Sequence, residues 1–298
     1  MTQLGMLVPQ HEIGTDPSLI VGWARAVEDH GFAYLDIFDH VLGADVTDRP
    51  NWPGPYTHEH RFHEPFVLYG FLAAAVRLDL ATGVLVLPQR QTVLVAKQAA
   101  ELDLLSGGRL RLGVGIGWNR VEHEALGCDF AGRARRYEEQ IGLLRRLWAE
   151  PVVDFTGDHH RIDRAGLAPR PARPIPIWIG GGAVPPVLDR VGRLGDGWIV
   201  HDPRAGAEVR EGMRLVRAAA NAAGRDPDAI GLQGRIEVHG GLDRDRFRRA
   251  LDAWASCEPT HLSIFASGQG GAGAHIDLLP HLAALVRDHL DLTLRGAP

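Results

Sequence analysis

The chain has few of the residues that build disulfide-stapled, basic or membrane-embedded proteins. Only two of its 298 residues are cysteine, Cys128 and Cys257, and their positions match no disulfide or metal-binding spacing. Lysine occurs once, at Lys97, so Schiff-base chemistry has one candidate, on what reads as an ordinary helix face. The net charge of −5 argues against binding phosphate backbones, which require clustered cations. We therefore expect reduced, structural cysteines and no nucleic-acid partner.

Long apolar runs are also missing. The longest, such as residues 81–88, are far too short to cross a bilayer, and the N-terminus lacks the basic-then-apolar pattern of a signal peptide. We expect a cytoplasmic protein with no membrane partner. The sequence also lacks a Gly-x-Ser-x-Gly elbow, a Walker loop, the kinase motifs and His-Glu-x-x-His, which disfavours acyl or phosphoryl transfer through these motifs.

The sequence does contain a regular alternation of strand and helix patterns. Apolar runs of strand length lie at 4–8, 34–38, 81–87, 110–114, 175–179, 197–200, 230–238 and 262–266. Helical patterns lie at 17–30, 64–76, 93–105, 121–126, 133–148, 185–194, 205–223, 243–254 and 276–289. The pattern at 133–148 keeps one apolar face, formed by Tyr137, Ile141, Leu144 and Trp148. Eight strand-helix units predict an α/β fold, a (β/α)8 TIM barrel, formed by one domain over residues 1–298.

Two predicted connections are too long for plain strand-to-helix loops. They span residues 40–63 and 118–174, and the second includes an extra helix and a turn-rich stretch at 154–171. Both begin at the C-terminal end of a strand, where barrel enzymes place their active sites. We expect these insertion segments to act as lids over the C-terminal face.

Glycine recurs at alternate positions in the fourth strand, at Gly113, Gly115 and Gly117. This is not a dinucleotide-binding loop, because Trp118 stands where a third glycine is needed and no acidic residue ends a following strand at the required distance. The missing side chains could let a flat group lie against the strand, let the backbone bend, or permit close packing inside the barrel. The sequence leaves these readings open.

A second glycine cluster, Gly180-Gly181-Gly182-Ala183, follows the fifth strand and precedes a helix that opens with Pro185 and Pro186. Backbone N–H groups and the positive end of a helix dipole form a natural phosphate site, so we predict one here. A tight turn without a ligand is the other interpretation.

Polar residues gather near the end of the second strand. Asp39 and His40 place a carboxylate and an imidazole at the predicted barrel mouth, where His40 can exchange a proton and Asp39 can fix its tautomer or hold a loop. A histidine that merely caps the strand is the alternative. Two further groups of polar residues are disfavoured as sites: His58, His60, His63 and Glu64 as metal ligands, and His159, His160 and Asp163, which we interpret as a solvated face.

Several short motifs follow one another in order along the chain. They are Gly108-Arg-Leu-Arg-Leu-Gly-Val-Gly-Ile-Gly-Trp-Asn119 with Glu122, Arg135-Arg-Tyr-Glu-Glu-Gln140, Leu147-Trp148, Arg170-Pro171, Ile175-Pro-Ile-Trp-Ile-Gly-Gly181 and Leu194-Gly-Asp-Gly-Trp198. As an ordered set they resemble the bacterial luciferase-like family of flavin and deazaflavin oxidoreductases, particularly its coenzyme F420-dependent branch. The resemblance extends to about residue 270.

This resemblance implies a barrel that usually forms a homodimer and binds its flavin or deazaflavin ring at the C-terminal mouth. It also implies a cis peptide behind the ring at Gly83–Val84, cofactor contacts near Gly115, and the cofactor phosphate near Gly180 to Ala183. Asp39 and His40 match the Asp-His pair of the deazaflavin enzymes. Sugar-phosphate dehydrogenases of this branch have a glutamate proton donor where this chain has Trp118, so Trp118 and Asn119 become candidate ring or substrate contacts. Glu122 could supply an acid, but we interpret it as a helix-surface carboxylate.

Three functional hypotheses follow from the residues and the resemblance. The first is an F420-dependent oxidoreductase that moves a hydride between the deazaflavin C5 and a small organic substrate, with His40 exchanging the proton and no metal. The second is an FMN-dependent monooxygenase supplied with reduced flavin by a partner reductase. The third is a cofactor-binding protein without turnover, which the intact Asp39, His40 and glycine clusters disfavour.

Overall fold

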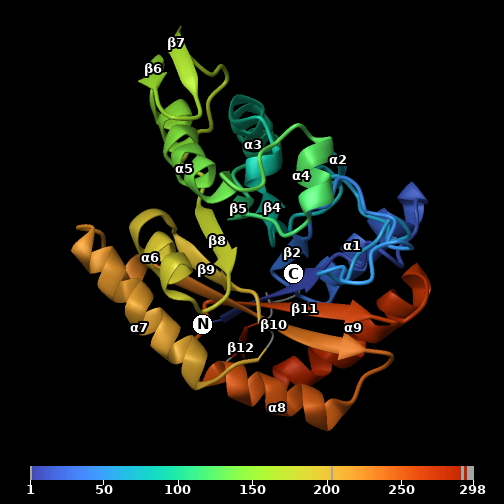
Figure 1. Ribbon diagram of the computed structural model, residues 1–298. Coiled ribbons are helices and arrows are strands. Elements are labelled where there is room, and N and C mark those ends of the chain that lie inside the picture. Colours follow the sequence, from blue (N-terminus) through green and yellow to red (C-terminus); the bar gives the residue numbers. More distant parts are fainter. Residues whose placement is uncertain (1, 203, 290–291, 294–298) are drawn as a thin grey trace.

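Eight parallel strands form a closed barrel in the computed structural model, which describes residues 2–202, 204–289 and 292–293 (Figure 1). In sheet order they are β1 (Thr2–Leu7), β2 (Tyr34–Ile37), β3 (Asp79–Thr82), β5 (Leu110–Gly115), β8 (Ile177–Gly181), β9 (Gly197–Val200), β10 (Gly231–His239) and β11 (His261–Ser267). β11 pairs with β1, placing Leu262 opposite Leu4, and this pairing closes the sheet. The short β12 (Leu292–Thr293) also pairs with β1. The predicted (β/α)8 TIM barrel is confirmed.

A ring of helices surrounds the strands (Figure 1). These helices are α1 (Pro17–Asp29), α2 (Pro65–Leu72), α3 (Thr92–Ser106), α4 (Arg120–Ala125), α5 (Arg133–Ala149), α6 (Pro185–Leu194), α7 (Ala207–Ala222), α8 (Arg244–Ala255) and α9 (Ala272–Arg287). The predicted start of α9 at residue 276 was too late: glycines obscure its first turn in the sequence, but Ala272 and His275 are buried there. Within the described ranges, no helix has the length and apolar character needed to span a membrane.

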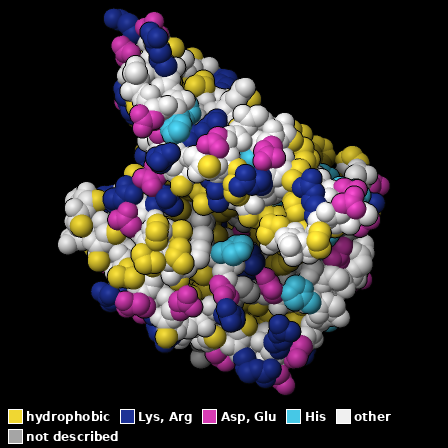
Figure 2. All heavy atoms as spheres, in the orientation of Figure 1, with side chains coloured by type: hydrophobic (Ala, Val, Ile, Leu, Met, Phe, Trp, Pro, Cys, Tyr) yellow, Lys and Arg dark blue, Asp and Glu magenta, His cyan; other side chains and the backbone are white. Residues whose placement is uncertain are grey.

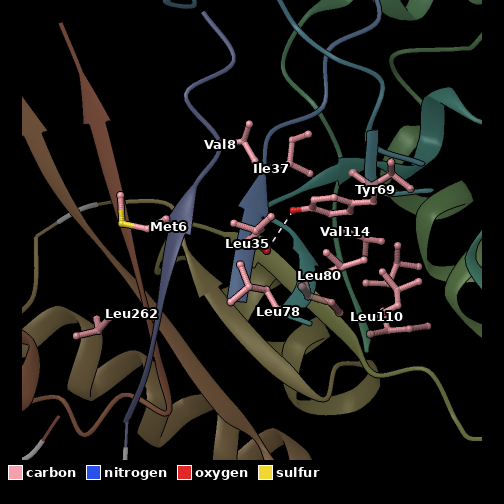
Figure 3. Packing of buried hydrophobic residues seen from close by; sticks show 14 of the residues in the cluster. Met6, Val8, Leu35, Ile37, Tyr69, Leu78, Leu80, Leu110, Val114 and Leu262 are labelled. Atoms are coloured by element: carbon pink, nitrogen blue, oxygen red, sulfur yellow. Dashed lines mark hydrogen bonds between the residues drawn. The ribbon is translucent and has the colours of Figure 1, made fainter. Parts of the chain in front are cut away.

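The hydrophobic core fills the space between the barrel and its helices. Leu35, Leu80 and Leu110, from three neighbouring strands, are buried together with Tyr69 of α2 (Figure 3). The Tyr69 hydroxyl donates toward the Leu35 and Ala81 carbonyl oxygens at 3.1 and 2.6 Å, so its polar end is satisfied inside the core. The predicted apolar face of α5 is confirmed, because Tyr137, Ile141, Leu144 and Trp148 are all buried.

The second long connection contains a hairpin that the sequence analysis missed. β6 (Val153–Thr156) and β7 (Arg161–Ala165) pair antiparallel and extend from the end of α5 (Figure 1). Most of their side chains are exposed, so they lack the apolar pattern that reveals a strand. His159 and Asp163 are exposed as expected, but a solvated His160 was wrong: its ring bonds Glu139 at 2.6 Å and Thr92 at 2.6 Å, which ties the hairpin to α5 and α3.

The third predicted strand is interrupted after β3. The Gly83–Val84 peptide bond is cis, as the resemblance implies, and the chain then continues as β4 (Leu85–Val86), which pairs with β5. A Cβ on Gly113 would lie 1.8 Å from the Thr82 carbonyl oxygen. Cβ atoms on Gly115 and Gly180 would each lie 2.5 Å from a Val84 methyl group. The alternating glycines therefore make room for close packing, and the space beside Gly115 is occupied by Val84.

This packing predicts a large effect from one added methyl group. Gly113→Ala should lower the free energy of unfolding by about 3 kcal/mol or more, because the new Cβ overlaps a backbone oxygen that cannot rotate away. The matched control is Gly142→Ala, at an exposed position inside α5 with open space around it, which should raise stability by about 0.5–1 kcal/mol. Urea denaturation of both variants measures the difference, and equal midpoints would contradict the packing argument.

Candidate active site at the barrel mouth

His40 lies just beyond the end of β2, inside a group of aromatic rings. Its ring centroid is 4.6 Å from that of Phe62, 5.2 Å from that of Tyr56 and 5.6 Å from that of Trp118. Phe62 and Tyr56 belong to the first long connection, and Trp118 follows β5. Only 9% of the His40 side-chain surface is exposed. The predicted lid segment 40–63 thus folds its aromatic residues against the histidine.

Glu122, on α4, is the closest ionisable partner of His40. Its side chain is fully buried, and Oε2 lies 3.2 Å from His40 Nδ1. Oε1 accepts hydrogen bonds from the backbone N–H groups of Val41 and Leu42. The interpretation of Glu122 as a surface carboxylate was wrong. The Asn119-x-x-Glu122 spacing is that of a capping box, and Asn119 caps α4 by accepting from the Glu122 N–H at 3.2 Å. The Glu122 side chain does not complete the box. It reaches across to the first long connection, which follows β2.

The electrostatic surroundings keep Glu122 charged. Burial on its own raises the pKa of a carboxyl group. Here the hydrogen bonds from His40, the Val41 N–H and the Gln89 amide outweigh burial and lower the pKa of Glu122 below its usual value. The carboxylate is therefore ionised at neutral pH and can only accept hydrogen bonds.

Gln89 and His123 lie behind this pair, and the sequence analysis singled out neither. Gln89 Nε2 lies 3.1 Å from Glu122 Oε2 and 3.0 Å from His123 Nδ1. His123 Nδ1 is also 3.1 Å from the Asn119 carbonyl oxygen. Burial lowers the pKa of His123, so its ring stays neutral at neutral pH. No local sequence signal could reveal the contacts of Gln89, because this residue lies far from α4 along the chain.

Asp39 makes a different set of contacts from those expected of a catalytic Asp-His pair. Its carboxylate accepts from Arg90 at 2.7 and 3.1 Å and from the Val86 N–H at 2.9 Å. Arg90 also donates to Glu64 at 2.8 Å. Of the two predicted roles for Asp39, loop fixation agrees with these contacts. Tautomer control of His40 by Asp39 was wrong, because the His40 ring nitrogen bonds Glu122.

The second glycine cluster offers fewer donors than the sequence suggested. Pro185 and Pro186 occupy the first turn of α6 and have no N–H groups. The N–H groups of Gly182 and Ala183 make no hydrogen bond to the described part of the chain, and a Cβ on Gly182 would meet open space. A phosphate in this turn would therefore be held by Gly182 and Ala183.

Several side chains that we predict to contact a cofactor lie at the barrel mouth. Figure 2 shows a hollow near the middle of the face seen in Figure 1, with hydrophobic side chains and a histidine beside it. Val84 packs against Gly115 and Gly180. Trp118 lies between His40 and Trp52, whose ring centroid is 5.4 Å from that of Trp118. Cofactor contacts by Gly83, Val84, Gly115, Trp118, Asn119 and the Gly180–Ala183 turn remain predictions.

Two histidines of the first long connection have hydrogen-bond partners within the protein. His60 Nδ1 accepts from the Thr57 N–H at 3.1 Å, and His63 Nε2 lies 3.1 Å from the Gly14 carbonyl oxygen. They line a cavity of about 370 Å³ that His40 also borders. Among the described residues, no group of three or more His, Cys, Asp or Glu side chains is arranged to hold a metal ion.

Comparison with known proteins places the chain in a family. The chain is 31% identical to an F420-dependent glucose-6-phosphate dehydrogenase of Amycolatopsis mediterranei, over 88% of this chain and 76% of that one. It is 30% identical to an F420-dependent hydroxymycolic acid dehydrogenase of Mycobacterium tuberculosis, over 84% of this chain and 66% of that one.

A solved structure shares the fold of this chain. A solved F420-dependent secondary alcohol dehydrogenase, in complex with an F420-acetone adduct, superposes with a TM-score of 0.78 at 18% identity, covering 96% of this chain and 99% of that one. The sequence model of the luciferase-like monooxygenases matches residues 2–292. The chain therefore belongs to the luciferase-like monooxygenase family.

Proposed function

We propose that this protein is an F420-dependent oxidoreductase acting on a small organic substrate. The observation that carries the proposal is the similarity to two relatives named as F420-dependent dehydrogenases, each extending over more than four-fifths of the chain. The His40 site at the barrel mouth supplies an acid-base group where such chemistry needs one. When bound, the deazaflavin would supply hydride transfer at its C5.

The residues at the mouth fit a flat ring with a phosphate tail. Val84, seated against Gly115 and Gly180, offers an apolar surface behind the ring, while Gly182 and Ala183 offer two N–H donors to a phosphate. Gly115 would thus act indirectly, by making space for Val84. Phe62, Tyr56 and Trp118 would keep water from the reacting atoms, and His40 would exchange a proton with the substrate.

Cofactor binding separates this proposal from the FMN-dependent monooxygenase that the family description also accommodates. Calorimetric titration of the purified protein with F420 and with FMN, each oxidised and reduced, should show clearly tighter binding of F420. Gly182→Val should weaken F420 binding about tenfold by crowding the phosphate turn. Preferential binding of reduced FMN would assign the protein to the oxygen-activating enzymes, and binding of neither cofactor would overturn the proposal.

His40 should be required for turnover rather than for cofactor binding. His40→Ala should lower kcat by roughly 10²-fold or more, with F420 affinity little changed, because proton transfer contributes to the chemical step. The control is His159→Ala, at an exposed histidine of the β6–β7 hairpin, which should keep the parent rate. Stopped-flow measurement of F420 absorbance gives both rates once a substrate is found, and unchanged turnover in His40→Ala would exclude the imidazole from the mechanism.

We also propose that the protein is a homodimer. Large apolar side chains are exposed on the adjacent helices α2 and α3, including Val67, Phe71, Val93 and Leu94. Light scattering should give about twice the 32.5 kDa mass of the chain. Replacing both Val67 and Leu94 with Glu should give monomers, whereas Val152→Glu, at an exposed valine before β6, should not. A parent protein of monomer mass would contradict the proposal.

A further inference from the structure

We propose that Glu122 is the positioning residue of this site: it holds the proton of His40 on Nδ1 and leaves Nε2 as the nitrogen that exchanges a proton with the substrate. The catalytic role of His40 rests on the proposed function. The orientation of its proton rests on the contacts of the chain alone, so the two can be tested separately.

The first step of the inference concerns which atom carries the proton. The Glu122 Oε2 atom lies 3.2 Å from His40 Nδ1, and the two carboxylate oxygens also accept from the Val41 N–H, the Leu42 N–H and the Gln89 amide, as an ionised carboxylate does. A carboxylate only accepts hydrogen bonds, so this contact requires the proton to lie on Nδ1. A neutral imidazole carries one N–H, and Nε2 is then the unprotonated nitrogen.

The second step concerns rigidity. Glu122 cannot easily turn away from His40, because Oε1 accepts from the Val41 and Leu42 N–H groups and Oε2 also accepts from Gln89. The helix that carries it is fixed by its Asn119 cap. A side chain held by three donors besides the histidine presents Oε2 at one place, which is what a positioning residue requires.

The third step concerns the opposite side of the ring. Phe62, Tyr56 and Trp118 pack around His40 and restrict its rotation. Nε2 has no hydrogen-bond partner in the described part of the chain, and it is not among the polar atoms that are buried there without a partner. Nε2 is therefore the ring nitrogen available to a bound molecule.

Glu122→Gln should reverse the tautomer while preserving the fold. The amide oxygen can still accept from the Val41 and Leu42 N–H groups, while its NH2 group donates to Nδ1 and moves the ring proton to Nε2. Gln89 can turn its amide to accommodate the change, because its oxygen has no partner among the described residues. The control is Glu124→Gln on the same helix, where the carboxylate is 62% exposed and pairs only loosely with Arg120 at 3.8 Å.

The primary experiment is ¹⁵N NMR of the histidine rings in the protein without cofactor, at a pH where the His40 ring is neutral, with the signal assigned by His40→Gln. The parent protein and Glu124→Gln should show a proton on Nδ1, and Glu122→Gln a proton on Nε2. A parent ring protonated on Nε2 would overturn the inference by itself. If Glu122→Gln does not fold, Glu122→Asp, which keeps a carboxylate, should retain the Nδ1–H form in the folded protein.

The kinetic experiment tests the consequence for catalysis. Glu122→Gln should lower kcat by roughly 10²-fold or more, as a wrong histidine tautomer does in other acid-base sites, while KM and F420 affinity change by less than about twofold. Glu122→Asp should recover part of the rate. Equal kcat in Glu122→Gln and Glu124→Gln would contradict the positioning role. Failure of F420 to bind would refute the proposed function and leave the NMR result valid.

Discussion

The carboxylate of Glu122 is a negative charge without access to solvent, and it is stable there because four donors from two parts of the chain surround it. Two are backbone N–H groups at the start of the first long connection, one is the Gln89 amide and one is the His40 ring. The requirement to satisfy this charge fixes the beginning of the loop, the orientation of the histidine and the position of α4 together. The contacts that stabilise the barrel mouth are therefore the same ones that hold the histidine of the proposed chemistry in place.

A second buried charge organises the neighbouring part of the mouth. Asp39 accepts a hydrogen bond from the Val86 N–H and forms an ion pair with Arg90. Arg90 also donates to Glu64 at the start of α2. These contacts connect the segment after β2 to β4, to the segment before α3 and to the start of α2. The backbone around Val84 is thus held from one side by ionic contacts and from the other by close packing against Gly115 and Gly180. The Val84 side chain is thus an apolar group with a supported backbone, which is what the proposed contact with a planar ring would need.

The sequence predicted the barrel well because its signals are local. A strand that must be buried shows a short apolar run, and a helix that packs on one side shows apolar residues at helical spacing. A barrel repeats this strand-helix unit once for each of its strands, so the pattern recurs along the sequence. The same reasoning failed for β6 and β7, which are largely exposed and carry charged residues. It also left the role of the alternating glycines in β5 open, because a glycine looks the same in the sequence whether a ligand or a valine side chain occupies the space beside it.

The sequence alone determined the order of the eight barrel strands and the helices around them, the position of His40 and Asp39 at a strand end, and the glycine turn before α6. Only the tertiary structure decided that His40 pairs with Glu122 and that Asp39 pairs with Arg90. The physical reason is distance along the chain. His40 and Glu122 are 82 residues apart, and Asp39 and Arg90 are 51 apart. Local propensity says which element a residue belongs to, but the contacts between buried charges are set by how the closed barrel brings separate loops together at one end.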